Sequence, residues 1–299
     1  MDKILIIKIG ALGDVVRTTP ILRALKGEIT WVTDPAAFPL LEGNPAVRRV
    51  VDVRRAGALA GERYRLALNL DEEPLACRIA SDVKKRELVG AYAGNSGPAY
   101  TDSSAPWFDM GLISRFGKKA ADRKKWENRR TYQELMFGML GLEFRGEEYL
   151  LPETPPPEEA VPDLIGLETR SGDRWKGKRW ARFGGFEKLL EERKRASFRF
   201  RTCPTLPDFV RAVDGAAAVV TTDSLAMHLA LALKKKTVAL FTCTSFHEIH
   251  GYGRMEKVVS PEIERYFYAD DPAMKSGESI APAAVWEALA RLESEKAAV

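Results

Sequence analysis

The chain has 299 residues, of which 45% are hydrophobic and 29% are charged, the balance of an ordinary folded protein. This balance excludes global disorder, a collagen-like sequence and a small disulfide scaffold. The length favours about two domains. No apolar run approaches the ~20 residues that a membrane span needs. The first apolar run, Ile4–Ile7, is preceded by Asp2 and ended by Lys8, unlike a secretory signal, so we expect a cytoplasmic protein.

Cysteine and histidine are scarce. The three cysteines, Cys77, Cys203 and Cys243, are far apart, and no CxxC pair is present. There are only three histidines. The sequence therefore predicts no metal centre and no redox motif, and we expect idle thiols in a reducing compartment.

The first half of the chain alternates short apolar runs with helical patterns. Strands are expected at residues 3–9, 28–33, 48–53, 65–70 and 86–92, and helices at 15–26, 34–43 and 131–142. Residues 94–128 show no clean period and are expected to form a long, functional loop. Alternating strands and helices predict a parallel sheet with right-handed crossovers.

A proline-rich stretch at residues 153–162 is the clearest linker. After it the alternation restarts: strands are expected at 163–167, 197–201, 216–221 and 236–242, and helices at 183–195, 206–213, 224–233 and 282–295. We therefore predict two α/β domains, residues 1–152 and 163–299, with a ligand-binding cleft between them.

The first chemical constellation is Gly10-Ala-Leu-Gly13-Asp14, between the first strand and the first helix. This is the usual place for a phosphate loop, but the spacing matches neither G-x-G-x-x-G nor a Walker A loop, and Asp14 would repel a phosphate. Asp14 is either an N-cap or first-turn acid favoured by the helix dipole, or a general base at a cleft edge.

The second constellation, Arg174–Trp180, follows the first strand of the second domain. Lys176, Lys178 and Arg179 lie on a loop that leads into a helix. Lysines beside a helix N-terminus suit a diphosphate, and the alternative is a plain basic surface loop.

The third constellation, Thr221–His228, has the pattern strand–turn–helix. Asp223 begins the helix and is either an N-cap or a ligand group. Ser224 and His228 are four residues apart and share a helix face. A packed core histidine is the alternative for His228.

Two basic clusters stand out in a chain of net charge +4. Lys118–Arg130 holds seven basic residues against Asp122 and Glu127, and Arg170–Arg182 holds six against Asp173. Such clusters indicate local anion sites or a solvated surface. No nucleic-acid recognition motif accompanies them, so nucleic-acid binding is not expected.

Three segments carry a resemblance. Ile4–Lys26 reads ILIIKIGALGDVVRTTPILRALK, Trp175–Phe183 reads WKGKRWARF, and Val219–Ser245 contains VVTTDSLAMHLALAL and KTVALFTCTS. In this order they resemble the opening, the start of the second domain and the sugar-donor segment of glycosyltransferase family 9, the lipopolysaccharide heptosyltransferases and their relatives.

The resemblance implies the GT-B fold, with two Rossmann-like parallel-sheet domains facing across a cleft. The first domain would bind the acceptor, and the second, ending in a closing helix, the nucleotide sugar. The reaction would be metal-independent and inverting, typically from ADP-heptose to the Kdo-lipid A core, with no cofactor. We further expect a monomer in peripheral contact with the cytoplasmic face of the inner membrane.

The resemblance also assigns residues. Asp14 takes the general-base position, and Lys178 that of the lysine that contacts the donor phosphates. The other donor-binding positions are Thr169, Asp223, Ser224 and His228. We expect Gly13 and the cations of the first basic cluster to bind an acidic acceptor: Lys118, Lys119, Arg123, Lys124, Lys125, Arg129 and Arg130.

The sequence departs from the family in three places. Asp223-Ser224-Leu225 stands where the family has Asp-Thr-Gly, Phe241–Thr244 replaces Phe-Gly-Pro-Thr, and the second domain is short by one strand–helix unit. Three functions stay open: a heptosyltransferase-like enzyme, a family-9 transferase with another sugar nucleotide or acceptor, and a non-catalytic GT-B protein that binds a glycan or a partner. A nicotinamide oxidoreductase is not favoured, because this sequence lacks the G-x-G-x-x-G motif of such enzymes.

Overall fold

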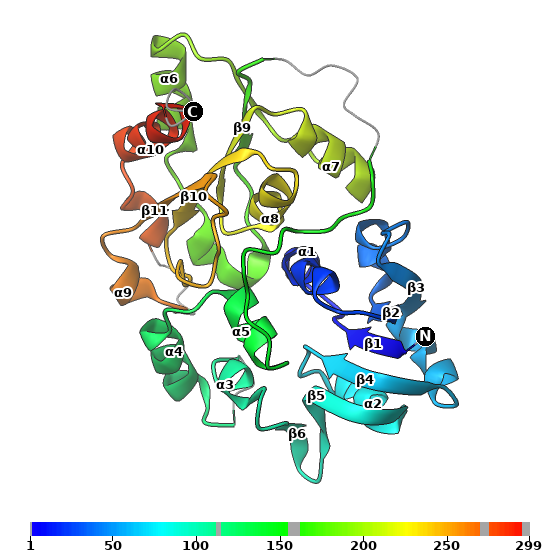
Figure 1. The fold of residues 1–299 in the computed structure, drawn as a ribbon. Coiled ribbons are helices and arrows are strands. Elements are labelled where there is room, and N and C mark those ends of the chain that lie inside the picture. The colour runs from blue at the N-terminus through cyan, green and yellow to red at the C-terminus, as the bar shows by residue number, and fades with distance from the viewer. Residues whose placement is uncertain (1, 112–114, 155–161, 270–274, 295–299) are drawn as a thin grey trace. The chain divides into compact units, whose positions relative to one another are not determined.

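Glu153 ends the first of the two units into which the computed structural model divides the chain, Met1–Glu153 and Thr154–Val299. Each unit is organised around its own β-sheet (Figure 1). The structure describes residues 2–111, 115–154, 162–269 and 275–294. Most of the predicted linker, residues 155–161, lies outside the described residues.

The first unit contains a six-stranded sheet in the order β3-β2-β1-β4-β5-β6. The strands are β1 Lys3–Ile7, β2 Glu28–Thr33, β3 Val47–Asp52, β4 Arg63–Asn69, β5 Lys84–Gly94 and β6 Gly97–Tyr100. Neighbours from β3 to β5 are parallel, and β6 turns back antiparallel to β5. β1 is central, and Ile4–Ile7 are all buried, which explains its continuous apolar run.

Helical segments cover both faces of this sheet. They are α1 Leu12–Thr18, η1 Thr19–Arg23, η2 Pro35–Leu40, η3 Val53–Leu59, α2 Pro74–Asp82, α3 Ala105–Phe108, α4 Lys118–Glu127 and α5 Tyr132–Gly138, where η marks a 3-10 helix. α2 packs over β4 and β5, and η3 over β2 and β3, where apolar side chains such as Leu5, Ile7 and Ile79 form a core. α1, η1 and α5 contact one another.

The predicted first helix, residues 15–26, is wrong in its extent. The α-helix ends at Thr18, and a 3-10 turn continues to Arg23. Pro20 has no backbone N–H and cannot donate the next α-helical hydrogen bond, so the chain tightens into a 3-10 turn there. The predicted helix at 34–43 is likewise the 3-10 segment η2, with Pro35 and Pro39 inside it.

The predicted long loop at residues 94–128 is also wrong, because β6, α3 and α4 lie within it. In α4 only Ala121 is buried, so no apolar stripe marks the helix. Its residues are mostly strong helix formers, and the ion pairs Lys118–Asp122 and Arg123–Glu127 join successive turns. The basic cluster is therefore displayed largely on a helix.

The second unit contains a five-stranded parallel sheet in the order β11-β10-β9-β7-β8. The strands are β7 Ile165–Glu168, β8 Ser197–Arg199, β9 Ala218–Thr222, β10 Lys236–Phe241 and β11 Met255–Val259. The helical segments are η4 Asp173–Lys178, α6 Phe183–Glu192, α7 Leu206–Asp214, α8 Leu225–Ala232, α9 Ile263–Tyr266, η5 Ser276–Glu278 and α10 Pro282–Ser294. Between α6 and α7 the chain forms the three-residue strand β8.

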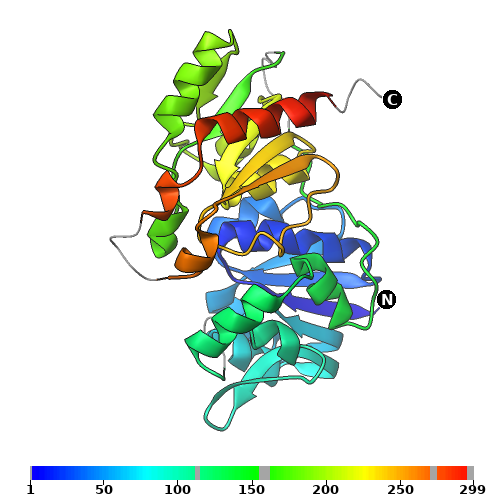
Figure 2. The same cartoon turned by 90° about the vertical axis from the view of Figure 1, so that its left-hand side faces the viewer.

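The core of the second unit lies where α6 and α10 pack against the sheet. Figure 2 shows α10 lying across β10 and β11. Apolar side chains including Trp180, Phe186, Val220 and Leu289 fill this layer. The predicted parallel α/β architecture of both domains is confirmed.

Each sheet has one position where the strand order reverses. In the first sheet it lies between β1 and β4, and in the second between β7 and β9. Connections from two such strands leave toward opposite faces, so a crevice opens outside their carboxyl ends, where open α/β sheets bind ligands. Asp14 follows β1, and Asp223 follows β9.

Candidate functional site

Asp14 lies in the first turn of α1, with Ala11 in the N-cap position. Its carboxylate therefore does not cap the helix, although the helix dipole favours an acid there. The side chain is 34% exposed, and Oδ1 lies 2.9 Å from Nη2 of Arg17. Gly13 precedes it in the same turn. The structure thus presents a carboxylate that a substrate hydroxyl can reach.

Arg17 is held by an aromatic ring. Its guanidinium lies 3.9 Å from the centroid of the Tyr132 ring, on α5. The Tyr132 hydroxyl is 2.8 Å from the Thr18 hydroxyl. Burial raises the pKa of Tyr132, against the opposing effect of Lys8 and Arg17, so the phenol stays neutral. A fixed cation therefore lies beside the Asp14 carboxylate.

A buried ion pair joins the ends of the two strands at the switch point. Lys8 follows β1 and Asp71 follows β4; their side chains are 8% and 12% exposed. Asp71 also accepts a hydrogen bond from the Ile9 N–H. Burial lowers the pKa of Lys8, but Asp71 and then Asp14 raise it above its ordinary value. Lys8 therefore stays charged and adds positive potential near Asp14.

Glu72 is a further carboxyl group at this edge. It accepts a hydrogen bond of 2.7 Å from the Tyr100 hydroxyl of β6. Burial raises the pKa of Glu72, although Tyr100 and Lys8 partly oppose the shift. Burial and the Glu72 carboxylate raise the pKa of Tyr100. Tyr100 thus remains a hydrogen-bond donor.

In the second unit Lys178 and Asp223 form an ion pair. Nζ and Oδ2 are 2.7 Å apart, and the two side chains are 19% and 17% exposed. Asp223 also accepts a 2.9 Å hydrogen bond from the Thr244 hydroxyl. The N-cap of α8 is Ser224, so capping does not explain Asp223. Two residues expected to bind different parts of a ligand are therefore paired with each other.

The loop that carries Lys178 is fixed from three sides. The hydroxyls of Thr242 and Ser276 donate to the Gly177 carbonyl at 2.6 and 2.8 Å. Gly277 packs so closely that a Cβ there would lie 1.8 Å from the Arg179 carbonyl oxygen. Trp175 meets Tyr268 edge to face at 5.3 Å. The ammonium group of Lys178 is therefore held on an ordered loop.

The remaining donor-binding predictions fall around the same switch point. Thr169 follows β7 and is partly exposed. The Ser224 hydroxyl is 2.8 Å from that of Thr221. His228 is only 4% exposed inside α8, as its core alternative requires. Thr222 Oγ1, at the end of β9, is buried and has no hydrogen-bond partner within the described residues.

Cys243 lies beside the Lys178–Asp223 pair. Burial raises the pKa of its thiol to about 11, although Lys178 lowers it. The thiol is therefore neutral near pH 7 and is not a nucleophile.

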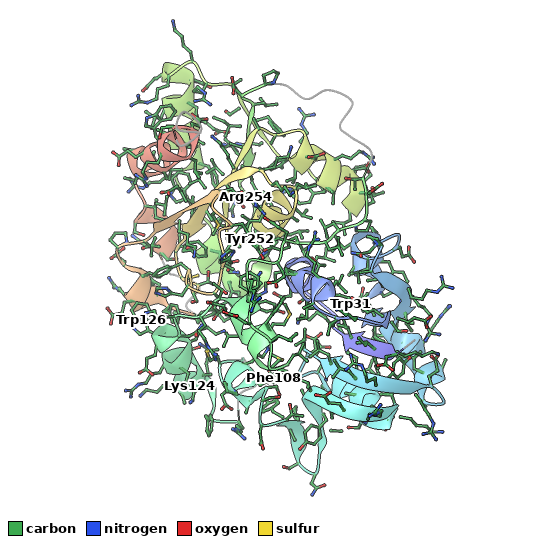
Figure 3. The ribbon with its side chains drawn as sticks, in the orientation of Figure 1. Trp31, Phe108, Lys124, Trp126, Tyr252 and Arg254 are labelled. Atoms are coloured by element: carbon green, nitrogen blue, oxygen red, sulfur yellow. The ribbon has the colours of Figure 1, made fainter. Side chains whose placement is uncertain are left out.

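The basic cluster forms one surface of the first unit. Six of its seven cations are exposed: Lys118, Lys119, Arg123, Lys124, Arg129 and Arg130. Lys125 is partly buried. Figure 3 labels Lys124 and Trp126 of α4. Phe116, 51% exposed, lies 5.3 Å from the Lys124 ammonium. This surface combines positive charge with an exposed aromatic ring.

The sequence patterns did not single out Arg17, Asp71, Tyr132 or Thr244. Arg17 could have been predicted from its spacing, since a cation three residues after Asp14 shares its helix face. The partners on other elements could not, because pairing across strands and helices depends on the fold.

A family model described as glycosyltransferase family 9 (heptosyltransferase) matches residues 191–271. A family-9 glycosyltransferase from Veillonella parvula DSM 2008 superposes with a TM-score of 0.66 at 17% identity, covering 98% of this chain and 97% of that one. E. coli heptosyltransferase WaaC, with ADP-2-deoxy-2-fluoro heptose, superposes with a TM-score of 0.60 at 17% identity, covering 97% of this chain and 99% of that one. E. coli ADP-heptose LPS heptosyltransferase II superposes with a TM-score of 0.62 at 16% identity, covering 99% of this chain and 100% of that one. No curated protein sequence matches this chain significantly.

These similarities show the fold of the chain. The fold over nearly the whole chain is that of the GT-B heptosyltransferases. The family model places the resemblance to glycosyltransferase family 9 on β8 to α9, the segment that contains Asp223. The predicted resemblance is confirmed, and it supports a glycosyltransferase.

Proposed function

We propose that the protein transfers a heptose or a related sugar from a nucleoside diphosphate donor to a lipopolysaccharide core or a similar glycan. The observation that carries the proposal is the division of chemistry between the two switch points. One presents an accessible carboxylate, Asp14, and the other a fixed ammonium group, Lys178. Sugar transfer needs both a proton acceptor and a cation for the departing diphosphate.

The proposed reaction is a single displacement with inversion. Asp14 takes the proton of the acceptor hydroxyl while the oxygen forms a bond to the anomeric carbon. The bond from that carbon to the diphosphate breaks, and the diphosphate leaves with the electron pair. Lys178 and the amino-terminal N–H groups of α8 stabilise the negative charge that develops on it, so no metal is assigned a role.

The Lys178–Asp223 pair gives Asp223 a role in this proposal. A diphosphate that binds Lys178 competes with the Asp223 carboxylate for the same ammonium group. Asp223 is then available to accept hydrogen bonds from sugar hydroxyls. The buried hydroxyl of Thr222 offers a further polar contact at the same strand end.

ADP-heptose is the first candidate for the sugar donor, since the WaaC structures contain ADP and an ADP-fluoroheptose. The acidic acceptor is assigned to the basic surface of α4. No helix among the described residues is long and apolar enough to cross a membrane. We propose action at the cytoplasmic face of the inner membrane, where a lipid-linked acceptor is available.

A nucleotide-sugar panel tests the proposal. ADP-, UDP- and GDP-sugars are screened by thermal shift, and the best binder is incubated with Kdo-lipid A or its heptosylated form and analysed by mass spectrometry. A product heavier by one sugar supports the proposal. Binding of glycans without any nucleotide-sugar binding would favour the non-catalytic alternative.

A further inference from the structure

The amino-terminal edge of the first sheet carries a cavity that the proposed function does not use. It has a volume of about 730 Å³ and lies where β1, β4 and β5 begin, at the opposite end of these strands from Asp14. Its lining includes one carboxylate, Asp2, and six cations: Lys3, Arg63, Arg65, Lys84, Lys85 and Arg86.

The strand register concentrates positive charge on one face of the sheet. Arg63 on β4 lies opposite Lys84 on the neighbouring parallel strand β5. The same register places Arg65 opposite Arg86. Residues two apart on a strand share a face, so these four cations lie together. Like charges across neighbouring strands repel each other and weaken the sheet, a cost that a bound anion would remove.

Some of the cations are already engaged. The Lys85 ammonium donates to the carbonyls of Ser81 and Val83, at 2.7 and 3.1 Å, beside the C-terminus of α2. Arg65 pairs with Asp2 at 3.2 Å.

Lys3 is engaged as well, by Glu62 at 3.1 Å. Arg63, Lys84 and Arg86 are exposed and take part in no ion pair or side-chain hydrogen bond within the described residues. Three cations are therefore available to a ligand.

We propose that this cavity is an anion site for a phosphate-bearing ligand, either a free polyphosphorylated molecule or a phosphorylated lipid headgroup. Guanidinium groups match phosphate oxygens in bidentate geometry, and Lys84 adds a point charge. The volume falls within the range of small-ligand sites, ~300–1,000 Å³. Most of the residues that line it are charged, so binding depends on charge and weakens with salt. The site shares no residue with the proposed transferase chemistry.

The test measures binding of sodium tripolyphosphate by calorimetry at low salt. The measurements use Lys178→Ala as the parent protein, which lacks the cation proposed to hold a donor diphosphate. The result therefore does not depend on whether Lys178 binds the donor. In this background Lys84→Gln/Arg86→Gln should weaken tripolyphosphate binding by about tenfold or more, because it removes two charge contacts to the anion near the protein surface. The matched control Lys188→Gln/Lys194→Gln removes two exposed cations of the second unit and should change tripolyphosphate binding less than about twofold.

Vesicles distinguish the two sources of phosphate. The wild-type protein is sedimented with phosphatidylcholine vesicles with and without phosphatidylglycerol. Binding that needs phosphatidylglycerol and is lost only in Lys84→Gln/Arg86→Gln supports a headgroup, and tripolyphosphate binding alone supports a free ligand. The proposed site would be overturned if neither tripolyphosphate nor the vesicles bind, or if both double variants lose binding equally. Thermal unfolding checks the fold, and Lys84→Gln/Arg86→Gln should melt no lower than its parent because it removes repulsion.

Discussion

Asp14, Arg17 and Tyr132 form a short chain of contacts that holds one carboxylate in place. Arg17 connects the other two, with an ion pair on one side and a ring contact on the other. An arginine keeps its charge at all relevant pH values, so the ion pair holds the carboxylate beside a permanent cation.

Asp14→Asn keeps the size of the side chain but removes its ability to take a proton. We expect the rate of sugar transfer to fall by ~10²–10⁴, the usual contribution of a general base. Single-turnover measurements with saturating substrates report this step. The thermal unfolding temperature of the variant serves as the control for folding, and an unchanged rate would contradict the assignment.

Substitutions of Lys178 and Asp223 should have opposite effects on nucleotide affinity. Lys178→Ala removes the cation, so ADP binding and kcat should both fall, each by roughly tenfold or more. Asp223→Asn removes the carboxylate that competes for Lys178 and can still accept from Thr244. We expect tighter ADP binding but slower transfer.

Calorimetry with ADP and steady-state kinetics separate these two effects. If both variants bind ADP as the wild type does, the pair is structural and the phosphate site lies elsewhere.

Glu72 gives a prediction about pH. Burial raises its folded-state pKa above the unfolded value of 4.5, so its ionised form costs folding free energy at neutral pH. This cost disappears as the pH falls below the unfolded value, where the group is protonated in both states. Glu72→Gln should therefore raise the unfolding temperature at pH 7 and change it little near pH 4. A variant destabilised equally at both pH values would show that packing dominates.

At the scale of elements, the proposed acceptor surface lies on α4. Lys119→Glu/Lys124→Glu should raise the acceptor KM about tenfold at low salt and flatten its salt dependence, because the surface attracts an acidic acceptor. The KM for the sugar donor should not change. The matched control Lys188→Glu/Lys194→Glu reverses two exposed charges of the second unit. If it raises the acceptor KM equally, the effect comes from net charge alone.

The elements that sequence patterns predicted are those that bury apolar side chains. β1, β9 and α10 carry clear runs or stripes because their side chains fill the cores. α4 has no such stripe, since its helix is stabilised by its own residue types and ion pairs. β11 was not predicted either, because all five of its residues are only partly buried. Hydrophobic periodicity reports burial, and these elements lack it.

The positions of the candidate site residues could be predicted more readily than their partners. Asp14 and Asp223 stand at strand–helix junctions, which the sequence marks with an apolar run and a change of period. The Lys178–Asp223 pair joins residues 45 positions apart, and Lys8–Asp71 joins residues 63 apart. Only the order of strands in the sheets brings these residues together.

At the scale of the whole molecule, ligand binding should be visible as stability. ADP at 100 times its Kd adds about 2.7 kcal/mol to the free energy of unfolding, if it binds only the folded form. For a unit of this size that corresponds to a rise of roughly 5–10 °C in unfolding temperature. A thermal-shift series with ADP, UDP and GDP measures it, and Lys178→Ala should reduce the shift. Equal shifts for all three nucleotides would contradict a preference for adenine.

The contacts that fix the lysine loop also set an order of events during synthesis. The Gly177 carbonyl accepts a hydrogen bond from the hydroxyl of Ser276, 99 residues later in the chain. The Trp180 indole donates to the Ile280 carbonyl, 100 residues later. At a translation rate of ~5–20 residues per second, the loop emerges ~5–20 s before the segment that completes it. A nascent chain that stops before residue 276 therefore lacks the contacts that fix the loop of Lys178. Nucleotide binding should be acquired only near the end of translation, after both sheets have been made.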